Sequence, residues 1–83
     1  MQTAASRLLK SKRLERGVSQ AKLARALGHG NPQFISNIER GLCRLPVSAA
    51  KKVCKILEIS TDEMLVKLTT DMQSELIRKW NSK

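Results

Sequence analysis

Residues 19–41, SQAKLARALGHGNPQFISNIERG, have the pattern of two short helices joined by a tight turn. Ser19 is a suitable N-cap for a helix that runs to Leu27, since its hydroxyl can accept a backbone N–H at the start of that helix. Asn31 and Pro32 begin a second helix, with proline at the first position, where its missing N–H costs nothing. This second helix is expected to end before Gly41.

The second of these helices has two distinct faces on a wheel of about 100° per residue. Ile35 and Ile38 lie on one side, and Leu42 is expected to continue that apolar stripe just beyond the helix. The opposite side carries neutral amides, a hydroxyl and one cation, namely Gln33, Ser36, Asn37 and Arg40. An amide side chain presents a donor and an acceptor together, which matches the N6 and N7 edge of adenine. The pattern leaves two interpretations: a surface that is merely solvated, or a surface that reads bases.

Outside this stretch the sequence predicts further helices and no strand. A first helix is expected over residues 3–16 and a fourth over residues 46–57. Ser60 and Glu63 form a capping-box pattern that begins a fifth helix. A separate helical stretch over residues 70–80 places Met72, Leu76 and Trp80 along one stripe. Because no segment alternates with period two over a useful length, the chain is predicted to be all-α, with five or six short helices.

The composition favours a polyanionic partner. The 83 residues carry 16 Lys plus Arg against 7 Asp plus Glu, which gives a formal charge of +9. Phe34 and Trp80 are the only aromatic side chains, which excludes modules that stack bases on aromatic platforms. Nucleic acid and an anionic membrane both fit the charge. A membrane is disfavoured because no expected helix combines a basic face with a broad, aromatic-rich apolar face.

The residue types needed for catalysis or metal binding are scarce. Cys43, Cys54 and His29 cannot supply the four ligands that structural zinc usually has, and no Ser/His/Asp arrangement stands at workable positions. We therefore predict that the protein is not an enzyme and has no metal or cofactor. Cys54 is expected to be a small core residue. No apolar segment typical of a signal peptide or a membrane span is found, so the protein is expected to be cytoplasmic.

Several separated blocks of the sequence stand in a characteristic order. They are RLLKSKR (7–13), GVSQ (17–20), LA (23–24), LG (27–28), ISNIERG (35–41) and Pro46. In order and nearly in spacing they resemble the Cro/phage-repressor family, the Xre-type helix-turn-helix proteins, over about residues 7–65. The resemblance implies a five-helix, lambda-repressor-like DNA-binding domain over residues 1–68, with a short C-terminal helical tail over residues 69–83. Helices 2 and 3 would form the helix-turn-helix, and helix 3 would lie in the major groove.

The resemblance also implies roles for individual residues. Gln33 and Asn37, with Ser36 as a further candidate, would read base edges. A second set, on the polar and basic positions around this face, would bind DNA phosphates: Gln20, Asn31, Arg40, Arg44, Lys10 and Arg13. Arg13 and Glu39 match a pair that links helix 1 to helix 3 in such domains, and Gln20 would also brace the recognition helix.

The turn departs from the family pattern. The segment His29–Phe34 holds one residue more than the commonest family spacing, and we place the extra residue near His29 and Gly30. His29 is interpreted as a polar turn residue rather than a ligand. Phe34 either packs against the turn or contacts a thymine methyl group.

The leading functional hypothesis is a sequence-specific transcriptional repressor that binds double-stranded DNA as a homodimer. Its operator would be an inverted repeat with half-sites about 10 bp apart. Met72, Leu76 and Trp80 are the candidate dimer interface, unless Trp80 folds back onto its own domain. Two alternatives stay open: an antitoxin that binds a toxin and autoregulates its operon, or a restriction–modification controller.

Overall fold

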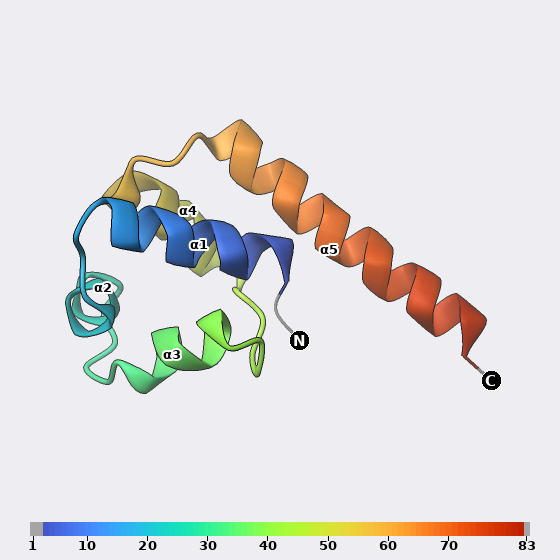
Figure 1. The fold of residues 1–83 in the computed structure, drawn as a ribbon, viewed down its shortest axis with the longest axis horizontal. Helices are drawn as coiled ribbons and strands as arrows, with labels where there is room; N and C mark the ends of the chain where they lie inside the picture. Colours follow the sequence, from blue (N-terminus) through green and yellow to red (C-terminus); the bar gives the residue numbers. More distant parts are fainter. Residues whose placement is uncertain (1–2, 83) are drawn as a thin grey trace.

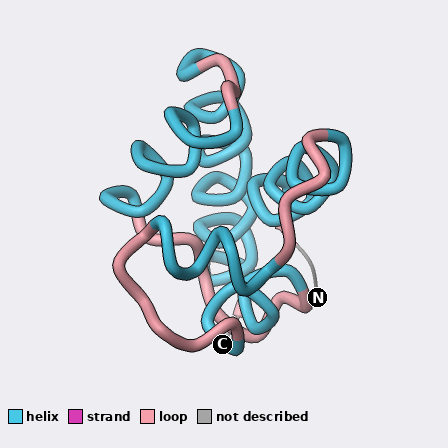
Figure 2. Tube along the Cα trace, turned by 90° about the vertical axis from the view of Figure 1, so that its left-hand side faces the viewer, coloured by secondary structure: helices cyan, strands magenta, loops and turns pink. Residues whose placement is uncertain are grey.

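The computed structural model describes residues 3–82, which form a chain of short helices followed by one long helix (Figure 1). The five helices are α1 (Ala4–Glu15), α2 (Gln20–Ala26), α3 (Gln33–Glu39), α4 (Val47–Leu57) and α5 (Thr61–Asn81). Between residues 3 and 82 there is no strand, and every regular element is helical (Figure 2). The all-α fold expected from the sequence is therefore confirmed.

Side-chain caps begin α2 and α5 where the sequence predicts them. Ser19 Oγ accepts the backbone N–H three residues later at 3.0 Å, and Ser60 Oγ does the same at 3.4 Å. The start of α1 has a reciprocal cap that the sequence pattern did not predict. There Thr3 Oγ1 accepts the N–H of Ser6 at 3.0 Å, and Ser6 Oγ accepts the N–H of Thr3 at 2.9 Å. These bonds satisfy N–H groups that have no partner within the first helical turn.

A single apolar core is formed by α1, α2, α3, α4 and the beginning of α5. Each helix contributes at least one side chain that is almost completely buried: Leu9, Leu23, Ile35, Ile38, Val53, Leu57 and Met64. In Figure 1, α1 crosses α4, and α2 and α3 lie together on one side of this pair. Full burial of a branched aliphatic side chain contributes about 1.5–3 kcal/mol. The two isoleucines therefore hold α3 with its apolar stripe turned inward.

The last helix differs from the expectation of two separate stretches. α5 continues through residues 61–81, so residue 68, the expected end of the DNA-binding domain, lies inside it. Thr69 and Thr70 stand at the expected break, but each hydroxyl donates to the carbonyl oxygen four residues earlier, at 2.8 and 2.9 Å. This back-bonding is compatible with a continuing helix. The second half of α5 extends beyond the body of the fold (Figure 1).

Two acidic side chains attach α5 to the rest of the molecule. Asp71 Oδ1 accepts the N–H of Ala4 at 2.7 Å, and Asp71 Oδ2 accepts the N–H of Ala5 at 3.0 Å. A carboxylate is favourable there because the first N–H groups of a helix carry a partial positive charge. One turn further along α5, Glu75 forms an ion pair with Arg44, in the loop that follows α3. The position of α5 is thus tied to both α1 and that loop.

Leu42 does not continue the apolar stripe of α3, contrary to the expectation, and is 65% exposed. The preceding Gly41 has a φ of +80°, in the left-handed region that glycine adopts without the cost of a Cβ. The chain changes direction at Gly41, so the helical wheel of α3 does not extend to Leu42.

Candidate nucleic-acid interface

The turn between α2 and α3 is closed by its own contacts. The N–H of His29 donates to the carbonyl oxygen of Ala24 at 2.8 Å, and Gly28 adopts a φ of +87°. The rings of His29 and Phe34 are stacked, with centroids 4.2 Å apart and planes 22° from parallel. Phe34 is half-buried and also packs against the core. The expectation that Phe34 packs against the turn is thus confirmed.

The helix α3 has the orientation that the sequence predicted. Ile35 and Ile38 are completely buried, whereas Gln33 and Arg40 are exposed. Asn37 is partly exposed, as is Ser36. Pro32 occupies the N-cap position of α3, one residue later than the cap expected at Asn31. The side chain of Asn31 still bonds to the start of the helix, because its Oδ1 accepts the N–H of Gln33 at 2.9 Å. The polar side of α3 is therefore turned toward solvent.

Three of the outward side chains are joined to one another. Gln33 Nε2 donates to Asn37 Oδ1 at 2.8 Å, and Arg40 Nη2 donates to the same oxygen at 3.0 Å. Asn37 Oδ1 therefore has two donors in the protein without DNA. Because these bonds lie on an exposed surface, their net contribution to stability is small. The residues of this outward row, Gln33, Asn37 and Arg40, are pre-aligned along the helix.

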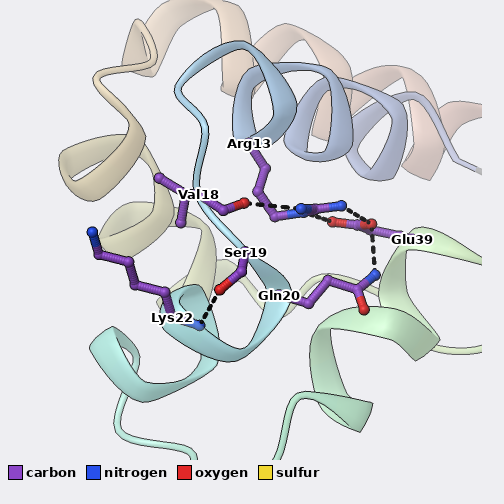
Figure 3. A network of polar contacts seen from close by, with 6 residues as sticks. All are labelled: Arg13, Val18, Ser19, Gln20, Lys22 and Glu39. Carbon is purple, nitrogen blue, oxygen red and sulfur yellow. Dashed lines mark hydrogen bonds and ion pairs between the residues drawn. The ribbon is translucent and has the colours of Figure 1, made fainter.

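A buried polar network joins α1, α2 and α3 (Figure 3). Arg13 Nε donates to Glu39 Oε2 at 2.6 Å, and Arg13 Nη2 donates to Glu39 Oε1 at 3.0 Å. The same Oε1 accepts Gln20 Nε2 at 3.0 Å, and Arg13 Nη1 donates to the carbonyl oxygen of Val18 at 2.9 Å. The Arg13 and Glu39 side chains are only 9% and 3% exposed. A bidentate, desolvated pair of this kind fixes the angle between the helices.

This network bears on two of the residues expected to contact phosphates. The phosphate role of Arg13 is not supported by the geometry, because its guanidinium is buried and donates to Glu39 and Val18. The brace expected from Gln20 is present as its bond to Glu39. Gln20 is also the first residue of α2 and is partly exposed, so its backbone N–H stands at the positive end of a helix.

The remaining expected phosphate contacts differ in their surroundings. Lys10 on α1 and Arg40 on α3 are exposed, as is Asn31 at the start of α3. The ammonium group of Lys10 has no hydrogen bond or ion pair within residues 3–82. Arg44 is exposed but is paired with Glu75 of α5. Neither Glu75 nor Asp71 was singled out in the sequence, since their contacts reach across the chain and have no local signal.

Two short helices with a tight turn, the second presenting its polar side outward, define a helix-turn-helix protein. A family model described as helix-turn-helix matches residues 9–64, which is more than half of the chain, and the chain therefore belongs to the helix-turn-helix family of the Cro/phage-repressor (Xre) type. It is accordingly a DNA-binding transcription regulator whose partner is double-stranded DNA. No curated protein and no solved structure matches the chain significantly. The match ends in the first turn of α5, so most of that helix lies outside it.

The exposed half of α5 carries apolar side chains that the core does not cover. Met72, Leu76 and Trp80 are all exposed, and Trp80 is 89% exposed. The expectation that Trp80 folds back onto its own domain is therefore wrong. Over residues 3–82, no helix has both the length and the apolar character needed to cross a membrane. Nor is any group of three or more metal-binding side chains found in the same part of the chain.

The two cysteines have different environments, which predicts different reactivity. Cys43 is exposed in the loop after α3, whereas Cys54 is buried on α4, and burial raises the pKa of the Cys54 thiol. A raised pKa lowers the thiolate fraction at neutral pH. We therefore expect iodoacetamide to modify Cys43 in the native protein and to leave Cys54 unmodified, as read by mass spectrometry of the peptides. In denaturant both should react; native modification of Cys54 at the rate of Cys43 would contradict the core placement.

Proposed function

We propose that the protein is a transcriptional repressor that binds an inverted-repeat operator as a homodimer, with α3 in the major groove. The observation that carries this proposal is the outward row of α3, in which Gln33 and Asn37 present neutral amides on a chain of net charge +9. Gln33 and Asn37 are the proposed base readers, with Ser36 as a secondary one. Repression would follow from occupancy of the operator by this domain.

Base reading would exchange contacts within the outward row for contacts to base edges. Gln33 and Asn37 stand one turn apart on α3 and are linked at 2.8 Å. Each amide can form a paired donor and acceptor contact with adenine, and such a contact discriminates by about 1–3 kcal/mol. Rotation of the two amides away from each other frees both for DNA, while the buried isoleucines hold the helix in place.

Affinity would come from phosphate contacts around this row. The proposed residues are Gln20, Asn31, Arg40, Arg44 and Lys10, which are all exposed or partly exposed. Phosphate contacts carry little sequence information but position the protein on the duplex. Their counterion release makes the affinity fall steeply as salt is added.

The experiment that tests this function is selection of bound duplexes from a random-sequence pool at physiological salt. We expect an enriched motif with dyad symmetry and half-sites about 10 bp apart, the spacing that a two-fold dimer imposes on one face of DNA. An enriched motif without symmetry would contradict the homodimer. A pool that stays random after repeated rounds would contradict sequence-specific regulation.

The homodimer is proposed to form through the exposed apolar side of α5. Met72, Leu76 and Trp80 follow one another at intervals of four residues, and apolar rows of this kind are typical of self-association. Light scattering of the full chain is expected to give about twice the mass of 9.3 kDa for one chain. Substituting both Leu76→Ser and Trp80→Ser should give the mass of one chain.

The control for this measurement is Leu14→Ser, because Leu14 is an equally exposed leucine on α1. Point substitutions are preferable to removing the tail, since truncation after residue 68 also deletes Asp71 and Glu75, which attach α5 to α1 and to Arg44. A wild-type mass of one chain would contradict the homodimer. A mass of one chain would favour a different protein as the partner of α5, such as the toxin of a toxin–antitoxin pair.

A further inference from the structure

A polar cavity lies between the start of α1, the loop after α3 and the second half of α5. Its volume is about 470 Å³, and its lining includes three arginines, namely Arg7 of α1, Arg44 of the loop and Arg78 of α5. The three side chains come from positions far apart in the sequence. The fold therefore brings together three guanidinium-bearing residues that no local pattern connects.

The positive charge around this cavity is only partly balanced. Asp71 is the one acidic residue in the lining, and both of its oxygens already accept backbone N–H groups of α1. Arg44 is paired with Glu75, which Lys79 also contacts at 3.3 Å. Arg7 and Arg78 are exposed, and within residues 3–82 neither has an ion-pair partner. An anion in the cavity would relieve the repulsion among the arginines.

The cavity is coupled to the recognition helix. Its lining includes Gly41, Leu42 and Cys43, and the N–H groups of Leu42 and Cys43 donate to the carbonyl oxygen of Asn37 at 2.8 and 3.3 Å. In Figure 1 the loop after α3 and the start of α1 lie at the same end of the body, next to α5. A group bound in the cavity would therefore keep a fixed distance from the outward row of α3.

We propose that Arg7 and Arg78 form, together with Arg44, a binding site for a phosphate of the DNA backbone beside the groove that α3 enters. Guanidinium groups bind phosphate oxygens through paired, charge-assisted hydrogen bonds. The projecting helix α5 is then part of the DNA interface, and Glu75 competes with the phosphate for Arg44. This inference rests on the proposed function, since it requires a duplex that α3 recognises.

The test measures the affinity for the selected duplex at several salt concentrations. Arg7→Gln combined with Arg78→Gln is expected to weaken binding and to reduce the slope of log affinity against log salt by about 0.9 for each phosphate that the variant no longer binds. The matched control is Lys51→Gln combined with Lys52→Gln, which removes the same charge from the exposed side of α4. Equal slopes for the two double variants would overturn the proposal.

Glu75→Gln is a second test, in which the affinity for the selected duplex is expected to increase and not to decrease. Freeing Arg44 is expected to tighten binding of the selected duplex and to steepen the slope of log affinity against log salt by about 0.9, because one further phosphate contact can then form. Glu63→Gln, at the exposed start of α5, is the control for the added net charge. Identical affinities for these two variants would overturn the competition between Glu75 and the phosphate.

Further results distinguish a failure of this phosphate site from a failure of the proposed function. If inorganic phosphate alone saturates the site at millimolar concentration while Arg7→Gln leaves DNA affinity unchanged, the cavity binds a free anion and the DNA assignment is overturned. If the wild-type protein enriches no duplex at all, the proposed function fails first. If a duplex is enriched and the arginine variants bind it like the lysine control, only this inference fails.

Discussion

Glu39→Ala is expected to lower the free energy of unfolding by about 3–5 kcal/mol, because it leaves the buried guanidinium of Arg13 without its carboxylate. Gln20 loses its acceptor in the same variant. Small domains have a total stability of about 5–15 kcal/mol, so this loss removes a large part of it. Urea denaturation followed by helical circular dichroism measures the change directly.

Two controls make this prediction specific to the buried network. Glu15→Ala removes the exposed partner of Lys12, 3.4 Å away, and should cost about 0–1 kcal/mol. Replacing both members of the buried pair, Arg13→Met with Glu39→Leu, should restore most of the stability, since no charge is then left unpaired. If Glu39→Ala unfolds at the same urea concentration as Glu15→Ala, the network does not hold α3 in place.

Asn37→Ala is expected to remove the preference at one operator position in each half-site, a loss of discrimination of about 1–3 kcal/mol. Asn37 Oδ1 accepts hydrogen bonds from both Gln33 and Arg40. The substitution therefore also removes the bonds that hold these two side chains in position. Stability should change little, because Asn37 is partly exposed and its side-chain bonds lie on the surface. Repeating the duplex selection with the variant measures the preference.

Lys10→Ala is the comparison for Asn37→Ala. Lys10 is exposed on α1, and its proposed contact is to a phosphate, so its removal should weaken all sequences alike and leave the enriched motif unchanged. A motif that survives Asn37→Ala intact would remove Asn37 from the base-reading residues.

The helices near the recognition face were predictable because their signals are local. Ser19 and Ser60 cap α2 and α5, as the sequence indicates, whereas the start of α3 was predicted one residue too early. The two faces of α3 follow from helical spacing, since Ile35 and Ile38 recur on one side of a short helix. The pairing of Arg13 with Glu39 depended on the family resemblance and not on any spacing rule.

Contacts between distant segments, and the path of the chain outside the helices, were not predictable in the same way. Helical periodicity does not apply beyond Gly41, where the backbone becomes left-handed and exposes Leu42. The sequence predicted a separate helical stretch over residues 70–80, but α5 continues through this region, and the hydroxyls of Thr69 and Thr70 bond to the helix itself. Asp71 caps a helix that lies 66 residues or more away in sequence, a pairing that only the tertiary fold creates.

If the outward amides of α3 contact bases, the side-chain NH₂ signals of Gln33 and Asn37 report that contact directly. In ¹H–¹⁵N spectra, both signals are expected to shift when the selected duplex is added and to stay near their free positions with a scrambled duplex of equal length. That result would show that the two amides contact the bases of the selected sequence. If both signals move equally with the two duplexes, or with neither, while the protein is bound, α3 does not read the sequence in the way described.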